Sequence, residues 1–390
     1  MMKFFTNLKE SLVKSSENFK KTFKFKHIIN YTIISAFLIV MIILLNVSNV
    51  VNRSTVSLLI TIAYSIILAI SLNLVVGFLG ELSLGHAGFM CVGAYIGCFF
   101  ANMLHDVINS PILVLIIGMI IGGLSAAVFG LIIGLPALRL KGDYLAIVTL
   151  AFGEIVRNIF KNLPMFGASK GLITNSIQME TKTLFVASFI TILIVLFLTQ
   201  NLIRSKHGRA ITAIRDNEIA AKAMGINITF YKLLVFTISA FFAGIAGVIY
   251  GHSATPVLYG TFSYNYSIEI LVMVVLGGMG SINGSIIAAV LISYVNFILR
   301  SQLTGDLAAL KLLIYAIILI VVVVFNNAPA LKPFKEKFSI KALKKLIFKK
   351  RTPETVVDDD AAWNRIDTKI KMDEVLSTDV IPPDGSEKSE

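Results

Sequence analysis

Long apolar runs separated by short polar turns occupy most of this chain. A helix needs about 20 mostly apolar residues to cross the hydrocarbon core of a bilayer. We therefore predict an all-α, polytopic membrane protein of about ten transmembrane helices, arranged as two inverted five-helix halves, since an odd number of spans in the first half inverts the second. The predicted spans are 28–47, 55–79, 84–104, 111–135, 143–161, 182–200, 231–252, 265–281, 284–300 and 310–327.

The one long polar interruption in the middle of the chain predicts a short helix outside the membrane, roughly over residues 217–224. Asp216 is a suitable N-cap, because its carboxylate can accept hydrogen bonds from the amides of a first turn. Glu218 is favoured there by the helix dipole and can pair with Lys222 four residues later. Gly225 is a typical C-terminal stop. An ordinary solvated loop helix is the alternative interpretation of this pattern.

Positive charge follows the pattern of membrane topology. The formal net charge is +12, and Lys and Arg gather in the N-terminal arm, in the central loop and after the last span. Because cytoplasmic flanks are enriched in Lys and Arg, we expect both termini and the central loop to be cytoplasmic, and the charge indicates no nucleic-acid partner. The expected parts are a basic arm at 1–27, the first transmembrane half (five spans plus span six) at 28–200, a cytoplasmic loop at 201–230, the remaining spans at 231–327, a basic cytoplasmic segment at 328–351 and an acidic disordered tail at 352–390.

The two flanks leave alternatives open. Phe residues among the lysines of the N-terminal arm suggest an amphipathic helix at the membrane surface, and a disordered basic arm is the other interpretation. The acidic tail has too few apolar residues to order itself. It either folds back on the basic segment before it or is solvated.

Neither a catalytic centre nor a metal site is predicted. Cys91 and Cys98 lie seven residues apart on one predicted helix, which separates their Cα atoms by about 10.5 Å. That is too far for a disulfide, so we expect two small buried residues. There is no Cys/His cluster and no G-x-x-x-x-G-K-[ST] phosphate-binding loop. We therefore predict no enzyme, no metal and no cofactor in this chain.

Two glycine-rich turns permit two interpretations. Glycine within spans lets helices pack closely, or it permits broken helices whose backbone groups line a polar pathway. The turns contain Gly77, Gly80, Gly85, Gly88 and Gly93 in the first, and Gly277, Gly278, Gly280 and Gly284 in the second. The candidate pathway residues are Asn73, Ser83, Gly85, His86, Gly88, Gly277, Gly278, Ser281 and Asn283.

Polar side chains within predicted spans are also candidates. Glu154 and Arg157 lie three residues apart on one helical face, which favours a structural ion pair. Glu269 has no obvious partner nearby in the sequence, so it joins the candidate pathway residues. For His86 we favour a hydrogen-bonded structural role over contact with a substrate. The Thr149 hydroxyl can bond back to its own helix.

Four stretches resemble one family of transport proteins. They are SLNLVVGFLGELSLGHAGFMCVGAY at Ser71–Tyr95, LKGDYLAIVTLAFGEIVRNIF at Leu140–Phe160, GRAITAIRDNEIAAKAMGIN at Gly208–Asn227 and VLGGMGSINGSIIAA at Val275–Ala289. In this order they resemble the permeases of branched-chain amino acid uptake, the LivH/LivM family, and most closely its LivM members. The resemblance covers about Ser57–Phe325.

The resemblance implies the permease subunit of an ABC importer for branched-chain or related hydrophobic amino acids in the bacterial plasma (inner) membrane. EIAAKAMG is similar to the loop with which such permeases dock on an ATPase, which implies a coupling helix with Glu218, Ala220, Ala221 and Gly225. The implied partners are a second homologous permease, two cytoplasmic ATPases that bind the ATP, a substrate-binding protein, membrane lipid and a small amino-acid substrate.

Two alternatives stay open. One is a permease of the same family for urea or short amides. The other is an ion-coupled secondary transporter that uses Glu154 or Glu269 as its coupling site and needs no ATPase. A docking helix favours the importer, because a secondary transporter has no use for one.

Overall fold

The computed structural model describes residues 34–36, 39–40, 42, 53–137, 140, 142–174, 176–177, 179–302, 317 and 320. The predicted arm, basic segment and acidic tail (1–27, 328–351 and 352–390) lie outside the described residues. Most residues of the predicted spans 28–47 and 310–327 lie outside them as well.

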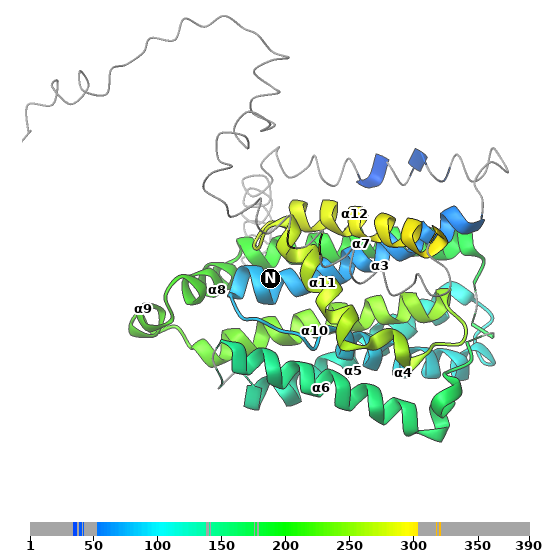
Figure 1. Ribbon diagram of the computed structural model, residues 1–390, viewed down its shortest axis with the longest axis horizontal. Coiled ribbons are helices and arrows are strands. Elements are labelled where there is room, and N and C mark those ends of the chain that lie inside the picture. The colour runs from blue at the N-terminus through cyan, green and yellow to red at the C-terminus, as the bar shows by residue number, and fades with distance from the viewer. Residues whose placement is uncertain are drawn as a thin grey trace, which may run out of the picture. The chain divides into compact units, whose positions relative to one another are not determined.

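The described chain is built from helices. The α-helices are α3 (Arg53–Asn73), α4 (His86–His105), α5 (Pro111–Ala137), α6 (Asp143–Asn162), α7 (Thr181–Arg204), α8 (Lys206–Asp216), α9 (Glu218–Ala223), α10 (Ile228–Ser253), α11 (Tyr264–Gly277) and α12 (Ile282–Gln302). The other helical turns are the π-helix η1 (Leu74–Leu79) and the 3-10 turns η2 (Pro164–Phe166), η3 (Ala168–Lys170) and η4 (Tyr259–Phe262). The long helices lie lengthwise beside one another, and α8 and α9 project at one end (Figure 1). We call this the α9 end of the bundle.

Six of these helices are long and apolar enough to cross a membrane: α3 continued by η1, α4, α5, α7, α10 and α12. Helix α11 is apolar but has only 14 residues, and α6 carries Glu154 and Arg157 in its second half. The prediction of an all-α protein with several membrane spans is thereby confirmed. Eight of the ten predicted spans coincide with described helices, namely α3 with η1, α4 to α7 and α10 to α12.

Helix α5 shows how the bundle meets its surroundings. Its exposed side chains are large and apolar over the whole length of the helix: Ile112, Leu113, Ile116, Ile120, Leu124, Val128, Leu131, Ile132 and Leu135. Water disfavours such a continuous apolar stripe, whereas lipid chains do not. Its buried face is lined largely by small residues, among them Gly118, Gly122 and Ala126.

Glycines bring α4, α5 and α10 into close contact. A Cβ atom on Gly93 would lie 2.3 Å from the backbone of Gly244 on α10, and one on Gly244 would lie 2.6 Å from the carbonyl oxygen of Gly122 on α5. Small residues at helix interfaces allow such close approach and optimise van der Waals packing in a membrane. For Gly93, this contact supports the interpretation that the glycine allows close helix packing rather than a broken helix.

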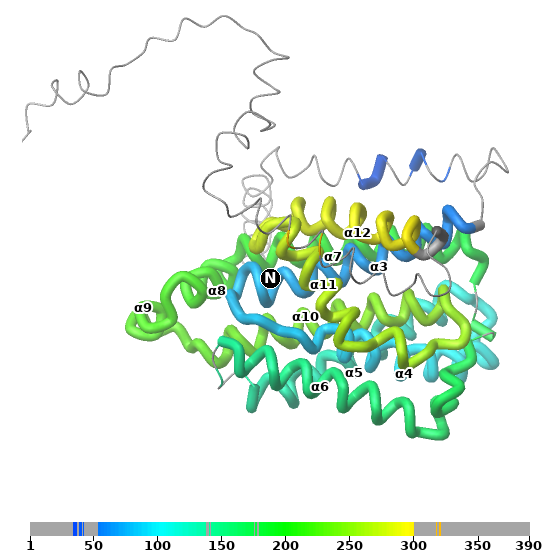
Figure 2. The backbone as a smooth tube through the Cα atoms, in the orientation of Figure 1, coloured from blue at the N-terminus to red at the C-terminus, as the bar shows by residue number. Residues whose placement is uncertain are grey.

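The chain between η1 and α4 runs as an extended segment into the bundle. Helix η1 ends at Gly80, in a left-handed conformation with φ +82°. Residues 80–85, the Gly80–Gly85 segment, then turn back from the α9 end toward the middle of the bundle, where α4 begins (Figure 2). Side chains from two other helices bind amides here: Leu84 N–H donates to Thr149 Oγ1 of α6, and Ala87 N–H donates to Ser267 Oγ of α11, each at 3.0 Å. Non-helical backbone at membrane depth is stable only when it is satisfied in this way.

Candidate functional site

Helix α9 lies where the sequence predicts a short helix, but its cap is a different residue. The Asn217 side chain accepts a hydrogen bond from the amide of Ala220 at 3.0 Å, so Asn217 is the N-cap. The prediction that Asp216 caps this helix is therefore wrong. Asp216 is the last residue of α8, and its carboxylate accepts two hydrogen bonds from Arg215 at 2.9 and 3.0 Å.

Gly225 follows the C-terminal end of α9 in a left-handed conformation, with φ +80°. Its amide donates to the carbonyl of Lys222 at 3.0 Å, and the amide of Ile226 donates to the carbonyl of Ala221 at 3.1 Å. This pair of bonds is a Schellman motif, as a glycine stop predicts. No atom lies within 4 Å of the place where a Cβ of Gly225 would sit, so the backbone conformation alone requires glycine here.

One face of α9 is exposed and apolar. Ile219 and Met224 are 81% and 83% exposed, and Ala220 and Ala223 between them are exposed as well. We call these four residues the α9 outer face. Large apolar side chains that stand out from a polar loop mark contact sites for other proteins. Ala221 is only 4% exposed and packs against the core of its own chain, so it contributes nothing to this face.

Helix α8, which the sequence pattern did not lead us to expect, holds α9 against the bundle. Ser205 caps it by accepting a hydrogen bond from the amide of Gly208 at 3.3 Å. Ile211 and Ile214, three residues apart on one face, are buried in the core. The local signal was present in the sequence as a serine followed by two isoleucines at helical spacing.

A buried lysine joins α9, α10 and the Gly80–Gly85 segment. Lys232 of α10 is 3% exposed, and its Nζ lies 2.5 Å from Glu81 Oε1 and 3.3 Å from Glu218 Oε2. Glu81 belongs to the Gly80–Gly85 segment, and Glu218 is the first residue of α9. The sequence predicts a pair between Glu218 and Lys222, whereas the structure joins Glu218 to Lys232. We call Glu81, Lys232 and Glu218 the charge triad.

Arg215 makes a second connection between the polar loop and the bundle. Its Nη1 donates to the carbonyl oxygen of Gly77 in η1 at 3.1 Å. Its side chain also passes close to the turn that follows, because a Cβ on Gly80 would lie 2.7 Å from Arg215 Cγ. Both connections from the α8–α9 region therefore reach the same stretch of chain, η1 and the Gly80–Gly85 segment.

Asn73 brings the two glycine-rich turns together at the α9 end. Its Nδ2 donates to Ser285 Oγ of α12 at 3.0 Å, and its Oδ1 accepts from the amide of Gly280 at 2.9 Å. The backbones are so close that a Cβ on Gly77 would lie 2.2 Å from the nitrogen of Gly280. We call this contact the glycine junction. Its closeness supports the packing interpretation for Gly77 of the first turn and Gly280 of the second.

The rest of the second turn lies beside this junction. A Cβ on Gly277 would lie 2.4 Å from the backbone of Gly284, and Gly278 has φ +90°. The Ser281 hydroxyl accepts a hydrogen bond from the amide of Gly284 at 3.2 Å. Ser281 and Asn283 line a small cavity of about 220 Å³. These pathway candidates are therefore close to one another and to Asn73.

The glycines around the start of α4 pack against α6. A Cβ on Gly85 would lie 2.2 Å from the carbonyl oxygen of Thr149, and one on Gly88 would lie 2.7 Å from Gly153 Cα. The Thr149 hydroxyl donates back to its own helix at Ala146, as expected. The same hydroxyl accepts the Leu84 amide described above.

His86 and Ser83 are both buried beside these glycines. His86 Nε2 lies 2.7 Å from Ser71 Oγ, and that hydroxyl also donates to the carbonyl of Leu68 at 2.8 Å. This geometry supports the structural interpretation of His86. The Ser83 hydroxyl has no hydrogen-bond partner among the described residues, so within this group Ser83 remains the stronger pathway candidate.

The ion pair expected in α6 is present. Arg157 Nη2 lies 2.5 Å from Glu154 Oε2. The other carboxylate oxygen of Glu154 accepts the amide of Tyr264, the first residue of α11, at 2.9 Å. Glu154 therefore connects two helices, which confirms its structural role.

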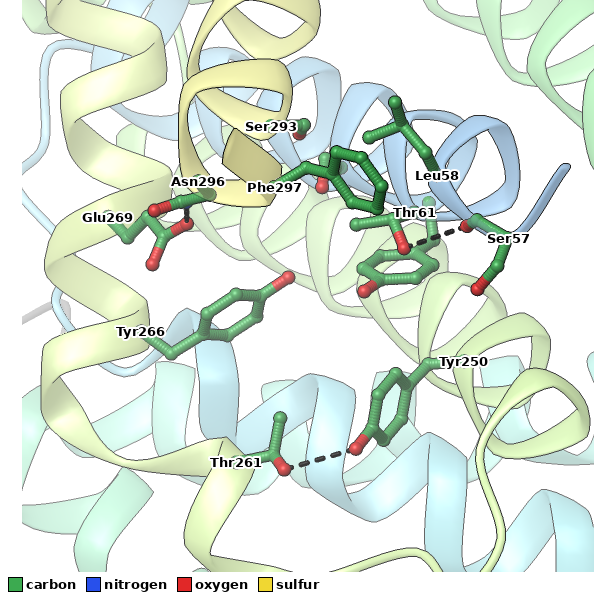
Figure 3. A pocket seen from close by; sticks show the side chains of 12 residues that line it. Ser57, Leu58, Thr61, Tyr250, Thr261, Tyr266, Glu269, Ser293, Asn296 and Phe297 are labelled. Carbon is green, nitrogen blue, oxygen red and sulfur yellow. Dashed lines mark hydrogen bonds between the residues drawn. The ribbon is translucent and has the colours of Figure 1, made fainter. Parts of the chain in front are cut away.

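Glu269 lies apart from all these residues. It projects from α11 into a cavity bounded by α3, α10 and α12, and the amide of Asn296 on α12 donates to its carboxylate (Figure 3). This partner could not be predicted from the sequence, because 27 positions separate the two residues.

Within the described ranges, no group of three or more His, Cys, Asp or Glu side chains could hold a metal ion. Cys91 and Cys98 are free and buried, as their spacing predicts. The arrangement has two parts. One is a helix with an exposed apolar face, joined by the charge triad and Arg215 to η1 and the Gly80–Gly85 segment. The other is a separate polar cavity lined by α3, α10, α11 and α12.

Comparison with known proteins places this architecture among transport permeases. Residues 54–323 match the family model described as branched-chain amino acid transport system / permease component. The chain is 36% identical to the high-affinity branched-chain amino acid transport system permease protein LivM of Salmonella typhimurium, over 57% of this chain and 58% of that protein. It is 36% identical to the LivM protein of Escherichia coli (strain K12), with the same coverage.

A probable branched-chain amino acid transport permease protein LivM of Methanocaldococcus jannaschii is 31% identical over 44% of this chain and 52% of that protein. The matches span less than two thirds of the length of these relatives. No solved structure matches the chain significantly. The family model, however, covers more than half of the chain and includes α9, the charge triad and both glycine-rich turns. The chain belongs to the family of branched-chain amino acid transport system permease components.

Proposed function

We propose that this chain is one transmembrane subunit of an ABC importer that moves branched-chain, or related hydrophobic, amino acids into a bacterial cell. The LivM relatives favour this substrate class over urea or short amides. The chain would pair with a second, homologous permease, two cytoplasmic ATPases that bind and hydrolyse ATP, and a substrate-binding protein. It would hold no cofactor of its own.

The observation that carries this proposal is the α9 outer face and its connection to the bundle. A separate ATPase needs a surface to bind, and it needs contacts that transmit its movement from that surface to the spans. Ile219 and Met224 provide the surface. The charge triad and Arg215 provide the path, because they join α9 and α8 to η1 and to the Gly80–Gly85 segment. Glu218 and Gly225 hold the helix in place, through the Lys232 contact and the left-handed turn.

The proposed topology follows from charge. Ten spans in two inverted halves place the α9 end, the basic segment and both termini in the cytoplasm, where Lys and Arg are enriched. ATP-driven closure of the two ATPases would then pull on α9 and tilt the spans. Substrate would enter from the opposite end of the bundle.

The experiment tests whether ATPase subunits bind through the outer face. In cells that carry Ile219→Ser together with Met224→Ser, we expect co-purification of ATPase subunits in mild detergent to fall by at least about tenfold. Loss of two buried side chains at an interface costs a few kcal/mol. ATP-driven uptake of labelled leucine should fall in parallel.

The matched control is Lys222→Ser. Lys222 is also exposed on α9 but lies outside the outer face, so its substitution should change co-purification less than twofold. The amount of chain in the membrane should be unchanged in all variants, since none of these side chains is buried in the bundle. Full ATPase association by the double variant would refute the docking role of α9.

A further inference from the structure

Helix α6 has the length of a membrane span but not the composition of one. Its 20 residues are enough to cross about 30 Å of hydrocarbon, and it lies at the edge of the bundle, on the opposite side from α12 (Figure 1). It is nevertheless not among the six helices that are apolar enough to cross a membrane. The residues on its outward side therefore decide whether that side can face lipid.

A line of exposed residues runs along α6. Its members follow one another at alternate spacings of four and three: Tyr144, Val148, Ala151, Ile155, Asn158 and Asn162. We call these six residues the α6 seam. This spacing keeps side chains on one straight face of a helix, and it is the pattern with which two helices pack lengthwise. The seam is about 27 Å long, so another helix could contact it over nearly the whole of α6.

Polar groups lie on and beside the seam. Glu154 is about 16 Å from the start of α6, close to the middle of the helix, and its ion pair with Arg157 leaves the two side chains 23% and 24% exposed. The Asn158 side chain donates to the Glu154 carbonyl at 2.9 Å, and that of Asn162 donates to the Asn158 carbonyl at 2.8 Å. Polar and charged groups within a span face protein or water rather than lipid.

Helix α5 of the same bundle shows the composition of a side that suits lipid. All of its exposed residues are apolar, and it contains no charged residue and no Asn or Gln. The α6 seam differs in two respects, because Ala151 at its centre is small and Asn158 is polar. Small residues and asparagine favour contact between helices in a membrane. The outward side of α5 therefore suits lipid, and the seam suits another protein helix.

Symmetry indicates which protein fits the seam. Two similar chains usually pair about a twofold axis, so that the same surface of each chain faces the other. The seam of one permease would then meet the corresponding helix of the second. Asn158 suits a position close to such an axis, because its amide can both donate and accept hydrogen bonds. A single Asn between paired helices also fixes their register.

We propose that the α6 seam is the surface on which the second permease packs, helix against helix. This inference rests on the proposed function, which requires two permeases, and it names the helix through which they meet. The contact would cover the exposed parts of Glu154 and Arg157, so that neither side chain faces lipid.

Photo-crosslinking at two matched positions tests the surface. Ile155 of the seam and Leu124 of α5 are 57% and 55% exposed, and both lie in the middle part of their helices. Each is replaced in turn by p-benzoylphenylalanine in cells that make the whole transporter, and the adducts are identified by mass spectrometry after irradiation. We expect a permease of the same family in the adduct at Ile155, and lipid alone at Leu124. Lipid alone at Ile155, an adduct within the same chain, or equal permease adducts at both positions would overturn the proposal.

Bulky substitutions test whether the contact is close. Ala151→Phe places a large side chain in the seam, and Val128→Phe does the same on the exposed side of α5. Co-purification in mild detergent of the permease captured at Ile155 is then measured. Because close interfaces penalise overpacking, we expect Ala151→Phe to lower its yield about tenfold, and Val128→Phe to leave it unchanged. Both residues are exposed, so the amount of chain in the membrane should stay the same. Equal yields for the two variants would count against the seam.

Asn158 is tested with one apolar and one polar replacement. Asn158→Leu removes the side-chain amide, whereas Asn158→Gln keeps it on a longer side chain. We expect co-purification of the second permease to fall for Asn158→Leu and to be largely kept for Asn158→Gln. Thermal unfolding of the purified chain by itself should differ little between the two variants, since the residue is exposed. Full association of Asn158→Leu would refute a polar contact across the seam.

Co-purification of ATPase subunits separates failure of this inference from failure of the proposed function. If the wild-type chain brings down ATPases and a second permease, but Ile155 forms no permease adduct, only the α6 assignment is refuted. If the wild-type chain brings down neither, the proposed function is wrong, and the inference is overturned with it.

Discussion

Lys232 Nζ lies 2.5 Å from the Glu81 carboxylate, although 151 positions separate the two residues in the sequence. Lys232 is buried and the Glu81 side chain is 13% exposed, and the pair joins the start of α10 to the extended segment that leads into α4. Glu218 adds α9 to the same contact. Movement of α9 therefore cannot leave the Gly80–Gly85 segment unaffected unless this contact breaks.

Lys232→Met should strongly destabilise the fold. Removal of one partner from a buried ion pair leaves an uncompensated charge, here on Glu81, at a cost of about 3 kcal/mol or more. Thermal unfolding of the purified chain in detergent measures this loss. The double variant Lys232→Met with Glu81→Gln should recover part of it. If the double variant is no more stable than Lys232→Met, the carboxylate is not the source of the loss.

Glu218→Gln should cost much less stability. The Glu218 side chain is about one third exposed, so solvent screens its charge and the expected change is below about 1 kcal/mol. Uptake should nevertheless fall, because this carboxylate is the only member of the charge triad that belongs to α9. Unchanged uptake in this variant would show that transport does not need the contact between Glu218 and Lys232.

Gly225 is best tested with two residues of different backbone preference. Gly225→Val should strain the left-handed turn by about 1–2 kcal/mol, whereas Gly225→Asn should be milder, because asparagine adopts this conformation more readily. No atom is close enough to clash with either side chain at its Cβ. We expect ATPase co-purification to fall for Gly225→Val and to be largely kept for Gly225→Asn. Equal loss in both would mean that the side chain itself obstructs docking.

Asn73→Ala should loosen the glycine junction. It leaves the Gly280 amide without its acceptor, and one unsatisfied buried group costs about 1–3 kcal/mol. Ser285→Ala is the matched comparison. Ser285 bonds only one end of the Asn73 side chain, while its hydroxyl also donates to the carbonyl of Ser281 at 3.1 Å. The midpoint of thermal unfolding should therefore fall further for Asn73→Ala than for Ser285→Ala.

Single cysteines test the proposed topology. Lys206 at the start of α8 and Ser253 at the end of α10 are both exposed, and the native Cys91 and Cys98 are buried and should not react. In intact cells an impermeant thiol reagent should label Ser253→Cys and not Lys206→Cys. Permeabilised cells should give labelling of both. Labelling of Lys206→Cys in intact cells would contradict a cytoplasmic α9.

Local chemistry made part of this site predictable. Helix α9 and its glycine stop depend on residues within one or two turns of each other, so propensity and the glycine rule located the helix and its end. The N-cap was predicted one residue too early, at Asp216 instead of Asn217. The orientation of the helix, by contrast, does not depend on nearby residues alone. Ala221 faces the core of the chain, and a sequence pattern of small residues cannot show which side of the helix turns inward.

Contacts between distant residues could not be predicted from one sequence. In the sequence, Lys232 is one of several cations beside a predicted span, and Glu81 is a charged residue in a predicted polar turn. Only the fold brings them together. The same holds for Glu269 with Asn296 and for Asn73 with Gly280. By contrast, the positions of eight helices could be predicted from the apolar runs. A membrane span must form all its backbone hydrogen bonds internally and be apolar over its whole length.

The extended segment before α4 has a consequence for how the protein is made. The hydrogen-bond acceptors of two amides are synthesised after the amides themselves. Thr149 accepts from the Leu84 amide, and Ser267, which accepts from the Ala87 amide, follows it by 180 residues. Until those helices have inserted, these amides can be satisfied only by water or by the insertion machinery. Each unsatisfied amide costs several kcal/mol in hydrocarbon. We therefore expect the start of α4 to reach its final depth only after α6 and α11 have entered the membrane.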